Sequence, residues 1–199
     1  FYGPADRDES IATIHAALDA GVTLIDTGDF YGMGHNEMLI GEAIRGRPRD
    51  AVQISVKFGA QRSPAGDWLG NDTRPQAVKA ALGAATFDAV VDWIAYTPAD
   101  VEADLALFRG RTGQYVFIST ASAYLKPAAL PIVESAPLGN PHWAYSRAKI
   151  ACEERLMRAF HEEGFPVTIV RPSHTYDATK LPMYGRYTVI DRMRRGEPV

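Results

Sequence analysis

The chain has 199 residues and a formal net charge of −3, from 21 lysines and arginines against 24 aspartates and glutamates. This length suffices for one sizeable α/β core and is too short for two complete enzyme domains. Dispersed positive charge argues against a nucleic-acid or anionic membrane surface, and no apolar run is long enough for a membrane span. The single cysteine, Cys152, fits a cytoplasmic protein without disulfides.

The first part of the chain is expected to alternate between helices and strands. Its first helix would take Ser10 or an upstream aspartate as N-cap and would end at Gly21. In chain order the expected elements are helix 6–20, strand 22–27, glycine-rich loop 28–35, helix 36–44, strand 52–58, a polar loop through Trp68 and Asn71, and helix 75–82.

The second part continues this alternation with longer β-branched and aromatic runs. We expect strands over 87–95, 114–120 and 167–172, and a helix from Ala144 onward with an apolar stripe. Ile150, Leu156, Met157 and Phe160 form that stripe. Strands alternating with helices predict an α/β fold with a parallel sheet, in a Rossmann-like doubly wound arrangement of three layers. The strand order also allows one merged five-stranded sheet.

Tyr145 and Lys149 form the most informative pair in the sequence, because they lie one turn apart on one face of the expected helix. A nearby ammonium favours the phenolate, so Lys149 is expected to lower the pKa of Tyr145. A tyrosine tuned in this way suits general acid/base work on a hydroxyl or carbonyl group. Thr120 ends the strand before this helix, at the sheet edge where ligands of parallel sheets bind. By itself the spacing is also common on solvated helix faces.

The runs FDAVVDWIAY, YVFISTASAY, YSRAK and VTIVRPSHTYD occur in this order. Together they make residues 83–199 resemble the extended short-chain dehydrogenase/reductase family, in its epimerase/dehydratase branch. The resemblance implies an NADP- or NAD-dependent oxidoreductase acting on a small molecule, such as a nucleotide sugar. Tyr145 would be the acid/base, Lys149 would also hold the nicotinamide ribose, and Thr120 would orient the substrate. The cofactor would further contact Ala95, Tyr96, Ser119, Pro172 and His174. In this family the helix that carries the tyrosine often pairs in a homodimer.

Residues 1–82 resemble a different family, the aldo-keto reductases, through FYGPADRDESIATIHAALDAGVTLIDTGDFYGMGHNEMLIGEAI and ISVKFG. This resemblance implies a fragment of a (β/α)8 barrel in which Tyr31 protonates a carbonyl. Asp26 and Lys57 would tune that tyrosine from two strand ends of the barrel mouth. The family's catalytic histidine and its phosphate-binding loops have no counterpart here, and neither does the glycine-rich opening of the dehydrogenase family.

The sequence is therefore expected to be a chimera, joined between about Pro75 and Gly83, and a fragment at both ends. Recombination, a mis-assembled reading frame and a deliberate join all fit. The run Thr27-Gly28-x-x-x-Gly32-x-Gly34 has the spelling of a dinucleotide loop, although it fits the reductase loop better. In the dinucleotide interpretation Gly28, Gly32 and Gly34 approach phosphate, and Lys57 and Arg62 favour NADP.

Three functions stay open from the sequence. They are an epimerase/dehydratase-type oxidoreductase using Tyr145, an aldo-keto reductase using Tyr31, and a truncated chimera that is catalytically inert. No metal site is expected, because the five histidines show no ligand spacing with Cys152 or with carboxylates.

Overall fold

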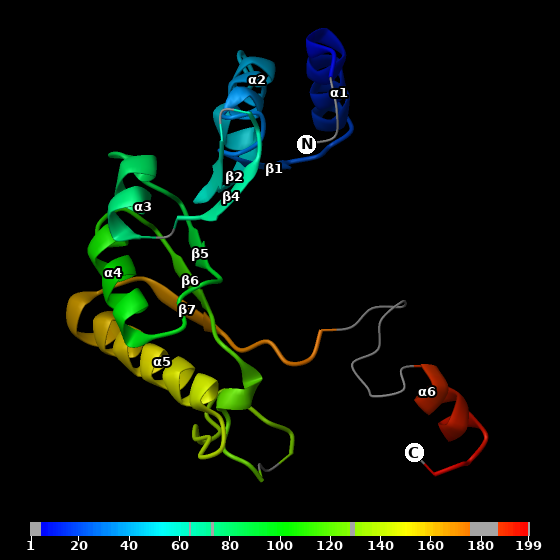
Figure 1. Ribbon diagram of the computed structural model, residues 1–199, viewed down its shortest axis with the longest axis vertical. Helices are drawn as coiled ribbons and strands as arrows, with labels where there is room; N and C mark the ends of the chain where they lie inside the picture. Colours follow the sequence, from blue (N-terminus) through cyan, green and yellow to red (C-terminus); the bar gives the residue numbers. More distant parts are fainter. Residues whose placement is uncertain (1–4, 64, 73, 128–129, 176–186, 199) are drawn as a thin grey trace. The chain divides into compact units, whose positions relative to one another are not determined.

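A computed structural model describes residues 5–63, 65–72, 74–127, 130–175 and 187–198 (Figure 1). The chain divides into two compact units, Phe1–Ala84 and Ala85–Val199. Each unit is described by itself.

The described part of the first unit contains a parallel pair of strands, an antiparallel pair of short strands and three α-helices. Its elements are α1 (Arg7–Asp19), β1 (Leu24–Gly28), α2 (His35–Ala43), the 3-10 turn η1 (Arg49–Ala51), β2 (Gln53–Lys57), β3 (Ala60–Arg62), β4 (Trp68–Asn71) and α3 (Pro75–Leu82). The side chain of Asp6 caps α1 by accepting from the amide of Glu9 at 2.8 Å, so the upstream aspartate is the cap rather than Ser10. In the parallel ladder Leu24 pairs with Gln53 and Gly28 with Lys57.

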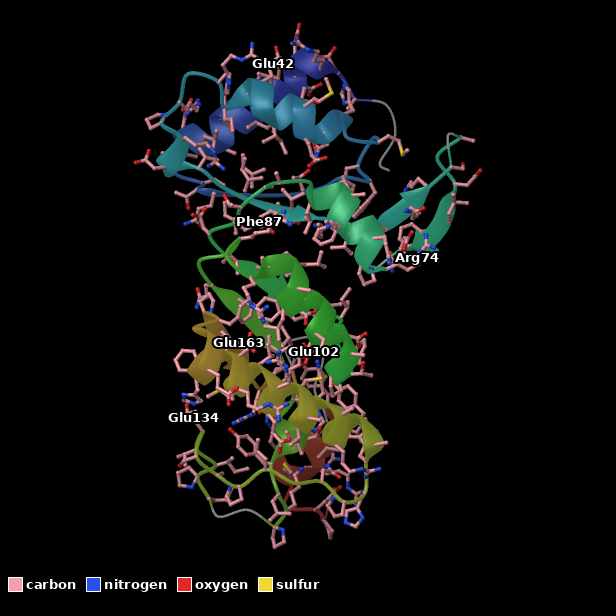
Figure 2. All side chains as sticks on the ribbon, turned by 90° about the vertical axis from the view of Figure 1, so that its left-hand side faces the viewer. Glu42, Arg74, Phe87, Glu102, Glu134 and Glu163 are labelled. Carbon is pink, nitrogen blue, oxygen red and sulfur yellow. The ribbon has the colours of Figure 1, made fainter. Side chains whose placement is uncertain are left out.

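Helices α1 and α2 are joined by polar contacts. The ring Nε2 of His15 lies 2.8 Å from the carbonyl oxygen of Ala43, and Arg7 pairs with Glu42, which Figure 2 labels on α2. Ile40 and Ala43 on α2 and Val52 before β2 are buried. The core of this unit therefore lies between α2 and the two parallel strands.

The region expected to be a polar loop is an antiparallel hairpin of β3 and β4, so the loop prediction is wrong. Ser63 closes the turn, because its amide donates to the carbonyl of Asp67 at 2.9 Å and its hydroxyl accepts from the amide of Asp67 at 3.0 Å. Gly66 has a φ of +89°, which suits a tight turn. The guanidinium of Arg62 lies 5.3 Å from the centroid of the Trp68 ring. Such cross-strand contacts are not visible in a polarity pattern.

The second unit is a parallel three-stranded sheet with two long helices. Its elements are β5 (Val90–Asp92), α4 (Pro98–Phe108), β6 (Tyr115–Ile118), the 3-10 turn η2 (Ala121–Ala123), α5 (Ala144–Glu163), β7 (Val167–Val170) and α6 (Tyr187–Arg194). The strand order is β5-β6-β7, with Val91 opposite Val116 and Phe117 opposite Ile169. Helix α4 begins with a capping box in which Thr97 and Asp100 satisfy each other's amides.

Both long helices cover the same face of this sheet. Tyr115 and Phe117 point to one side of β6 and are fully buried. The hydroxyl of Tyr115 reaches Asp104 on α4, and the ring centroid of Phe117 lies 4.2 Å from the Nζ of Lys149 on α5. On the opposite face Val91 and Val170 are 49% and 40% exposed. Within the described part of this unit the core therefore lies between the sheet and the α4–α5 pair.

Ion pairs on the surface also hold α4 against α5. Arg155 pairs with Glu102 on α4 and with Glu163 at the end of α5, and Arg109 pairs with Glu163. Figure 2 labels both glutamates. In the two pairs that join the helices, Arg155–Glu102 and Arg109–Glu163, one partner is more than half exposed, so these contacts orient the helices more than they stabilise them.

The predicted α/β class with parallel sheets is confirmed. The ladders pair β1 with β2 in the first unit and order the strands of the second unit as β5-β6-β7, and the single merged sheet stays a prediction. The strand expected over 87–95 is shorter, because Ile94 and Ala95 turn back to bond the Asp92 carboxylate. No helix among the described residues is both long and apolar enough to cross a membrane.

The apolar stripe expected on α5 is wrong in part. Met157 and Phe160 are 40% and 47% exposed, whereas Lys149 and Glu153 are 1% exposed and lie in the same buried face as Leu156. Buried partners satisfy the two charged groups, as described below. The helix therefore buries a charged stripe that a hydrophobicity pattern assigns to solvent.

Candidate active site

The second unit brings Thr120, Tyr145 and Lys149 to the carboxyl end of its parallel sheet. Thr120 lies two residues after the end of β6 and caps η2, and its side-chain oxygen accepts from the amide of Ser122 at 3.2 Å. Tyr145 and Lys149 lie in the first two turns of α5. Because the turn after β6 and the start of α5 are in contact through serine hydroxyls, these three residues come from neighbouring parts of one fold.

Lys149 is nearly fully buried, and its ammonium joins the ends of two strands. Its Nζ donates to the carbonyl of Ala95 after β5 and to the carbonyl of Ile118 at the end of β6, at 2.7 Å in both cases. The same nitrogen lies 5.2 Å from the centroid of the Tyr96 ring. Burial lowers the pKa of Lys149, and the carboxylates of Asp92, Glu153 and Asp100 oppose this shift. Lys149 therefore joins the segment after β5 to the end of β6 at the carboxyl edge of the sheet.

Tyr145 is half-buried among aromatic rings. Its ring centroid lies 4.8 Å from that of Trp143 and 6.1 Å from that of Tyr96. Burial raises the pKa of Tyr145, and Tyr96 raises it further. The expectation that Lys149 lowers this pKa is therefore wrong in this structure, because the ammonium is engaged by backbone carbonyls. The described surroundings keep the phenol neutral.

A chain of hydroxyl groups links the turn after β6 to helix α5. The Oγ1 of Thr120 lies 2.9 Å from the Oγ of Ser122, which lies 2.7 Å from the Oγ of the buried Ser146. Asn140 supports both ends: its Nδ2 donates to the carbonyl of Ser122 at 2.9 Å, and its Oδ1 accepts from the amide of Trp143 at 2.9 Å. Ser122, Asn140 and Ser146 were not predicted from the sequence, although Ser146 is adjacent to the tyrosine.

Other predicted cofactor contacts have clear positions. Ser119 is buried and its hydroxyl donates to Glu153, so that hydroxyl is committed to the protein interior. Tyr96 is 50% exposed, while the carbonyl of Ala95 accepts from Lys149. Pro172 and His174 are exposed after β7, and the carbonyl of Pro172 accepts from the amide of Ala121 at 3.0 Å.

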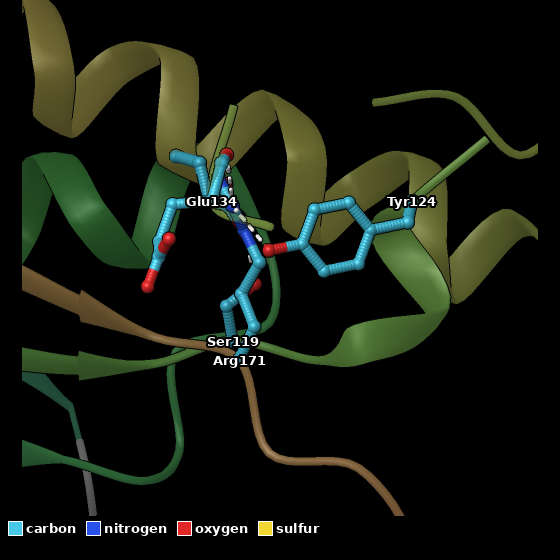
Figure 3. A network of polar contacts seen from close by, with 5 residues as sticks. Ser119, Tyr124, Glu134 and Arg171 are labelled. Atoms are coloured by element: carbon cyan, nitrogen blue, oxygen red, sulfur yellow. Dashed lines mark hydrogen bonds and ion pairs between the residues drawn. The ribbon is translucent and has the colours of Figure 1, made fainter. Parts of the chain in front are cut away.

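A buried ion pair supports this edge of the sheet and was not anticipated. Arg171, directly after β7, holds Glu153 of α5 through Nε and Nη2 and donates from Nη1 to the hydroxyl of Tyr124 at 3.0 Å (Figure 3). Hydrogen bonding to Glu153 raises the pKa of Arg171. The signal in the sequence was the run of charges at 149 and 153 on the helical face of Leu156.

The first unit brings Tyr31, Asp26 and Lys57 together. Lys57 forms an ion pair with Asp26, and its Nζ lies 5.3 Å from the centroid of the Tyr31 ring. Hydrogen bonding to Asp26 raises the pKa of Lys57, with a smaller contribution from Tyr31. Both charged side chains are substantially exposed, in contrast to the buried Lys149.

The glycine-rich loop of the first unit is tightly closed on itself. Gly32 and Gly34 have φ values of +60° and +87°, and Gly34 is the N-cap of α2. A Cβ on Gly28 would lie 2.9 Å from the Phe30 ring. The amides of Asp29, Tyr31, His35 and Asn36 all donate to protein carbonyls, so they do not face outward as in a phosphate cradle. This geometry favours the reductase interpretation of the loop over the dinucleotide interpretation.

No group of three or more potential ligands for a metal ion occurs among the described residues. The features with chemical meaning are instead hydroxyl groups and a lysine at the carboxyl edge of a parallel sheet, the edge at which open α/β sheets bind ligands.

Comparison with known proteins assigns the two parts of the chain to two families. The sequence profile of the NAD dependent epimerase/dehydratase family matches residues 71–199, more than half of the chain, and the chain belongs to this family. The profile of the aldo/keto reductase family matches residues 2–86. The predicted double resemblance is therefore confirmed, and a nicotinamide dinucleotide agrees with the first family's description.

Individual relatives cover short parts of the chain. "Probable aldo-keto reductase 1" from Glycine max is 41% identical over 56 residues, 28% of this chain and 16% of that protein. "Aldo-keto reductase YhdN" from Bacillus subtilis is 43% identical over 72 residues, 35% of this chain and 20% of that protein. The chain thus spans a fifth or less of the length of these relatives.

Among solved structures, the epimerase Mth375 from Methanothermobacter thermautotrophicus matches with a TM-score of 0.50 at 11% identity. The match covers 81% of this chain and 55% of that one. At this identity the likeness shows the fold alone.

Proposed function

We propose that the second unit performs reversible hydride transfer between NAD or NADP and a secondary alcohol or ketone, with Tyr145 as the acid/base. The observation that carries this proposal is that the start of α5, which holds Tyr145, is bound to the carboxyl edge of the sheet at two points. Ser146 bonds the hydroxyl chain of Ser122 and Thr120, and the buried Lys149 bonds the end of β6. A ketone or nucleotide sugar that enters an epimerase or dehydratase cycle is the substrate class of this proposal.

The residues of the second unit fit the nicotinamide half of a dinucleotide. Tyr96 is half exposed beside Tyr145, and the Lys149 ammonium places a positive charge beneath the same edge. The glycine loop of the first unit does not offer the amides of Asp29, Tyr31, His35 and Asn36 to a phosphate, because these amides donate to protein carbonyls. In the reduction of a ketone a bound nicotinamide would supply the hydride and the protein the proton, and in the oxidation of an alcohol the nicotinamide would accept the hydride and the protein the proton.

The raised pKa of Tyr145 keeps the phenol protonated, which leaves it a proton to donate but makes it a weaker acid than an unshifted tyrosine. A neutral phenol is a donor, so Tyr145 in these surroundings suits protonation of a carbonyl oxygen during reduction. Thr120 would donate a second hydrogen bond to that oxygen, as Ser122 can accept or donate in turn. Lys149 would act through position, because it fixes the turn of Ala95 against the end of β6.

The test uses the complete chain and titrates NADPH and NADH by fluorescence, followed by turnover of ketone substrates. Tyr145→Phe should lower kcat about 100-fold or more while cofactor binding is kept. Tyr187→Phe, at a half-exposed position on α6, is the matched control and should change neither quantity. Turnover that survives in Tyr145→Phe rejects the proposal.

A second candidate is an aldo-keto reductase reaction in the first unit, with Tyr31 as the proton donor. The Asp26–Lys57 pair and the 5.3 Å distance from Lys57 to the Tyr31 ring centroid support it. Here Tyr31→Phe abolishes turnover and Tyr145→Phe does not. A chain that binds neither cofactor corresponds to the third candidate, an inert chimera.

A further inference from the structure

One network in the second unit has no role in the chemistry proposed so far. It joins the end of β7, the middle of α5 and the turn after β6, and Figure 3 shows Arg171 between Ser119, Tyr124 and Glu134. The Glu153 side chain at its centre is 2% exposed and that of Arg171 is 18% exposed.

All three nitrogens of the Arg171 guanidinium donate hydrogen bonds. Nε donates to both carboxylate oxygens of Glu153, at 3.1 and 3.0 Å, and Nη2 donates to Oε2 at 2.6 Å. Nη1 donates to the hydroxyl of Tyr124 at 3.0 Å and to the carbonyl of Glu134 at 3.3 Å. Glu153 also accepts from the hydroxyl of Ser119. The planar fork matches these acceptors in a way that a lysine does not.

The network contacts both ends of the turn that carries Thr120. Ser119 precedes Thr120, and Tyr124 follows η2. The backbone on either side of Arg171 bonds the same turn, since the carbonyl of Val170 accepts from the amide of Ser119 at 2.7 Å. The carbonyl of Pro172 accepts from the amide of Ala121 at 3.0 Å. Two side-chain bonds, from Ser119 to Glu153 and from Arg171 to Tyr124, and these two backbone bonds therefore fix the turn that carries Thr120.

We propose that Arg171 and Glu153 are positioning residues that fix the turn Ser119–Tyr124, and with it the Thr120 hydroxyl, against helix α5. The effect on turnover through Thr120 rests on the proposed function, whereas the fixing of the turn rests on the contacts alone. A buried ion pair is costly to desolvate and is often no more stabilising than apolar packing. The Arg171 guanidinium binds several acceptors at once, and this geometry, rather than a gain in stability, explains why a charged pair is buried here.

The structural arm of the test measures amide hydrogen exchange along the complete chain. Glu153→Gln and Tyr124→Phe should speed exchange of the Ser119 and Ala121 amides about tenfold or more, while amides of α4 exchange as in the wild type. Tyr124→Phe removes a single oxygen, so it keeps the test valid if Glu153→Gln does not fold. Glu102→Gln, which breaks an exposed ion pair on the same helix pair, is the control.

The catalytic arm compares kcat with KM. Tyr124→Phe should lower kcat about tenfold with cofactor affinity unchanged, because Thr120 contacts the substrate oxygen and not the dinucleotide. Exchange at Ser119 and Ala121 that stays at the wild-type rate in both variants overturns the inference, whether or not the chain turns over. If the wild-type chain shows no turnover but the variants exchange the Ser119 and Ala121 amides faster, the proposed function is overturned and the positioning role is kept.

Discussion

The buried cluster of Asp92, Asp104 and Tyr115 makes a sharp prediction about pH. The Tyr115 hydroxyl lies 2.9 Å from an oxygen of Asp92 and also contacts Asp104. One hydroxyl has a single proton to donate, so the second contact requires a proton on a carboxyl group. Burial and the Asp92 charge raise the pKa of Asp104 from 3.8 to about 7, against a hydrogen bond from Tyr115 that lowers it.

The consequence for stability follows from proton counting. Between pH 4 and 7 the unfolded chain loses this proton while the folded chain keeps it, so folding becomes less favourable as the pH rises. At about 1.4 kcal/mol per pKa unit, the loss across this window is at most about 4 kcal/mol. Above pH 7 both states are ionised and this contribution levels off.

Asp104→Asn should remove the effect, because an amide N–H can donate permanently to the Tyr115 oxygen. We expect the variant to match the wild type near pH 4.5 and to exceed it by up to about 4 kcal/mol at pH 8. Slow hydrogen exchange of β6 amides at several pH values reads the stability of this unit, and an NMR titration of the Asp104 carboxyl reads its midpoint. Asp88→Asn, an exposed change before β5, is the control.

Parallel stability curves for Asp104→Asn and the wild type from pH 4.5 to 8 refute the reasoning, as does a carboxyl midpoint near 4. Asp100 and Lys149 face the same cluster, and both stay in place in the variant. The difference between the two proteins therefore isolates the Asp104 proton.

Three further predictions concern α5. Leu156→Ala should destabilise the second unit by about 2–5 kcal/mol in urea unfolding, whereas Met157→Ala at a 40% exposed position should cost less than about 1 kcal/mol; equal losses contradict the buried face described here. Lys149→Met should lower the free energy of unfolding by about 2–5 kcal/mol because it leaves the carbonyls of Ala95 and Ile118 unpaired. An unchanged denaturation midpoint would contradict a stabilising role for these two bonds. Burial raises the pKa of the Cys152 thiol to about 11, so a thiol reagent at pH 8 should label it only after unfolding; rapid labelling of the folded chain argues against this burial.

Local patterns predicted most elements because neighbouring residues determine them. The bounds expected for α3 agree with those observed, and β1 and β2 begin within two residues of their predicted starts. Proline at the first helical turn and alternation between strands and helices are features of the chain itself. The hairpin of β3 and β4 was missed because its strands are three and four residues long and rest on a turn that Ser63 closes.

The candidate site was harder to predict, because its support comes from residues far apart in the chain. Arg171 and Glu153 are 18 positions apart, and Asn140 and Ser122 are also 18 apart. Polarity assigned Glu153 to solvent, although it is 1% exposed. A single sequence shows which residue types are present, but not which distant charge pairs with which. The elements that carry Thr120, Tyr145 and Lys149 agree with those expected from the sequence, and the roles of these residues stay a prediction.

Each unit has a lysine near a candidate catalytic tyrosine, but the lysine is exposed in the first unit and buried in the second. In the first unit an exposed lysine, Lys57, lies near the Tyr31 ring and is paired with Asp26. In the second unit Lys149 is buried on two carbonyls, and the pKa of Tyr145 is raised. A protonated Tyr145 has a proton to donate and cannot accept one, so the second unit should reduce ketones more readily than it oxidises alcohols at neutral pH. Oxidation should gain on reduction as the pH rises, and a ratio of forward to reverse kcat that does not change between pH 6 and 10 would exclude Tyr145 as the proton donor.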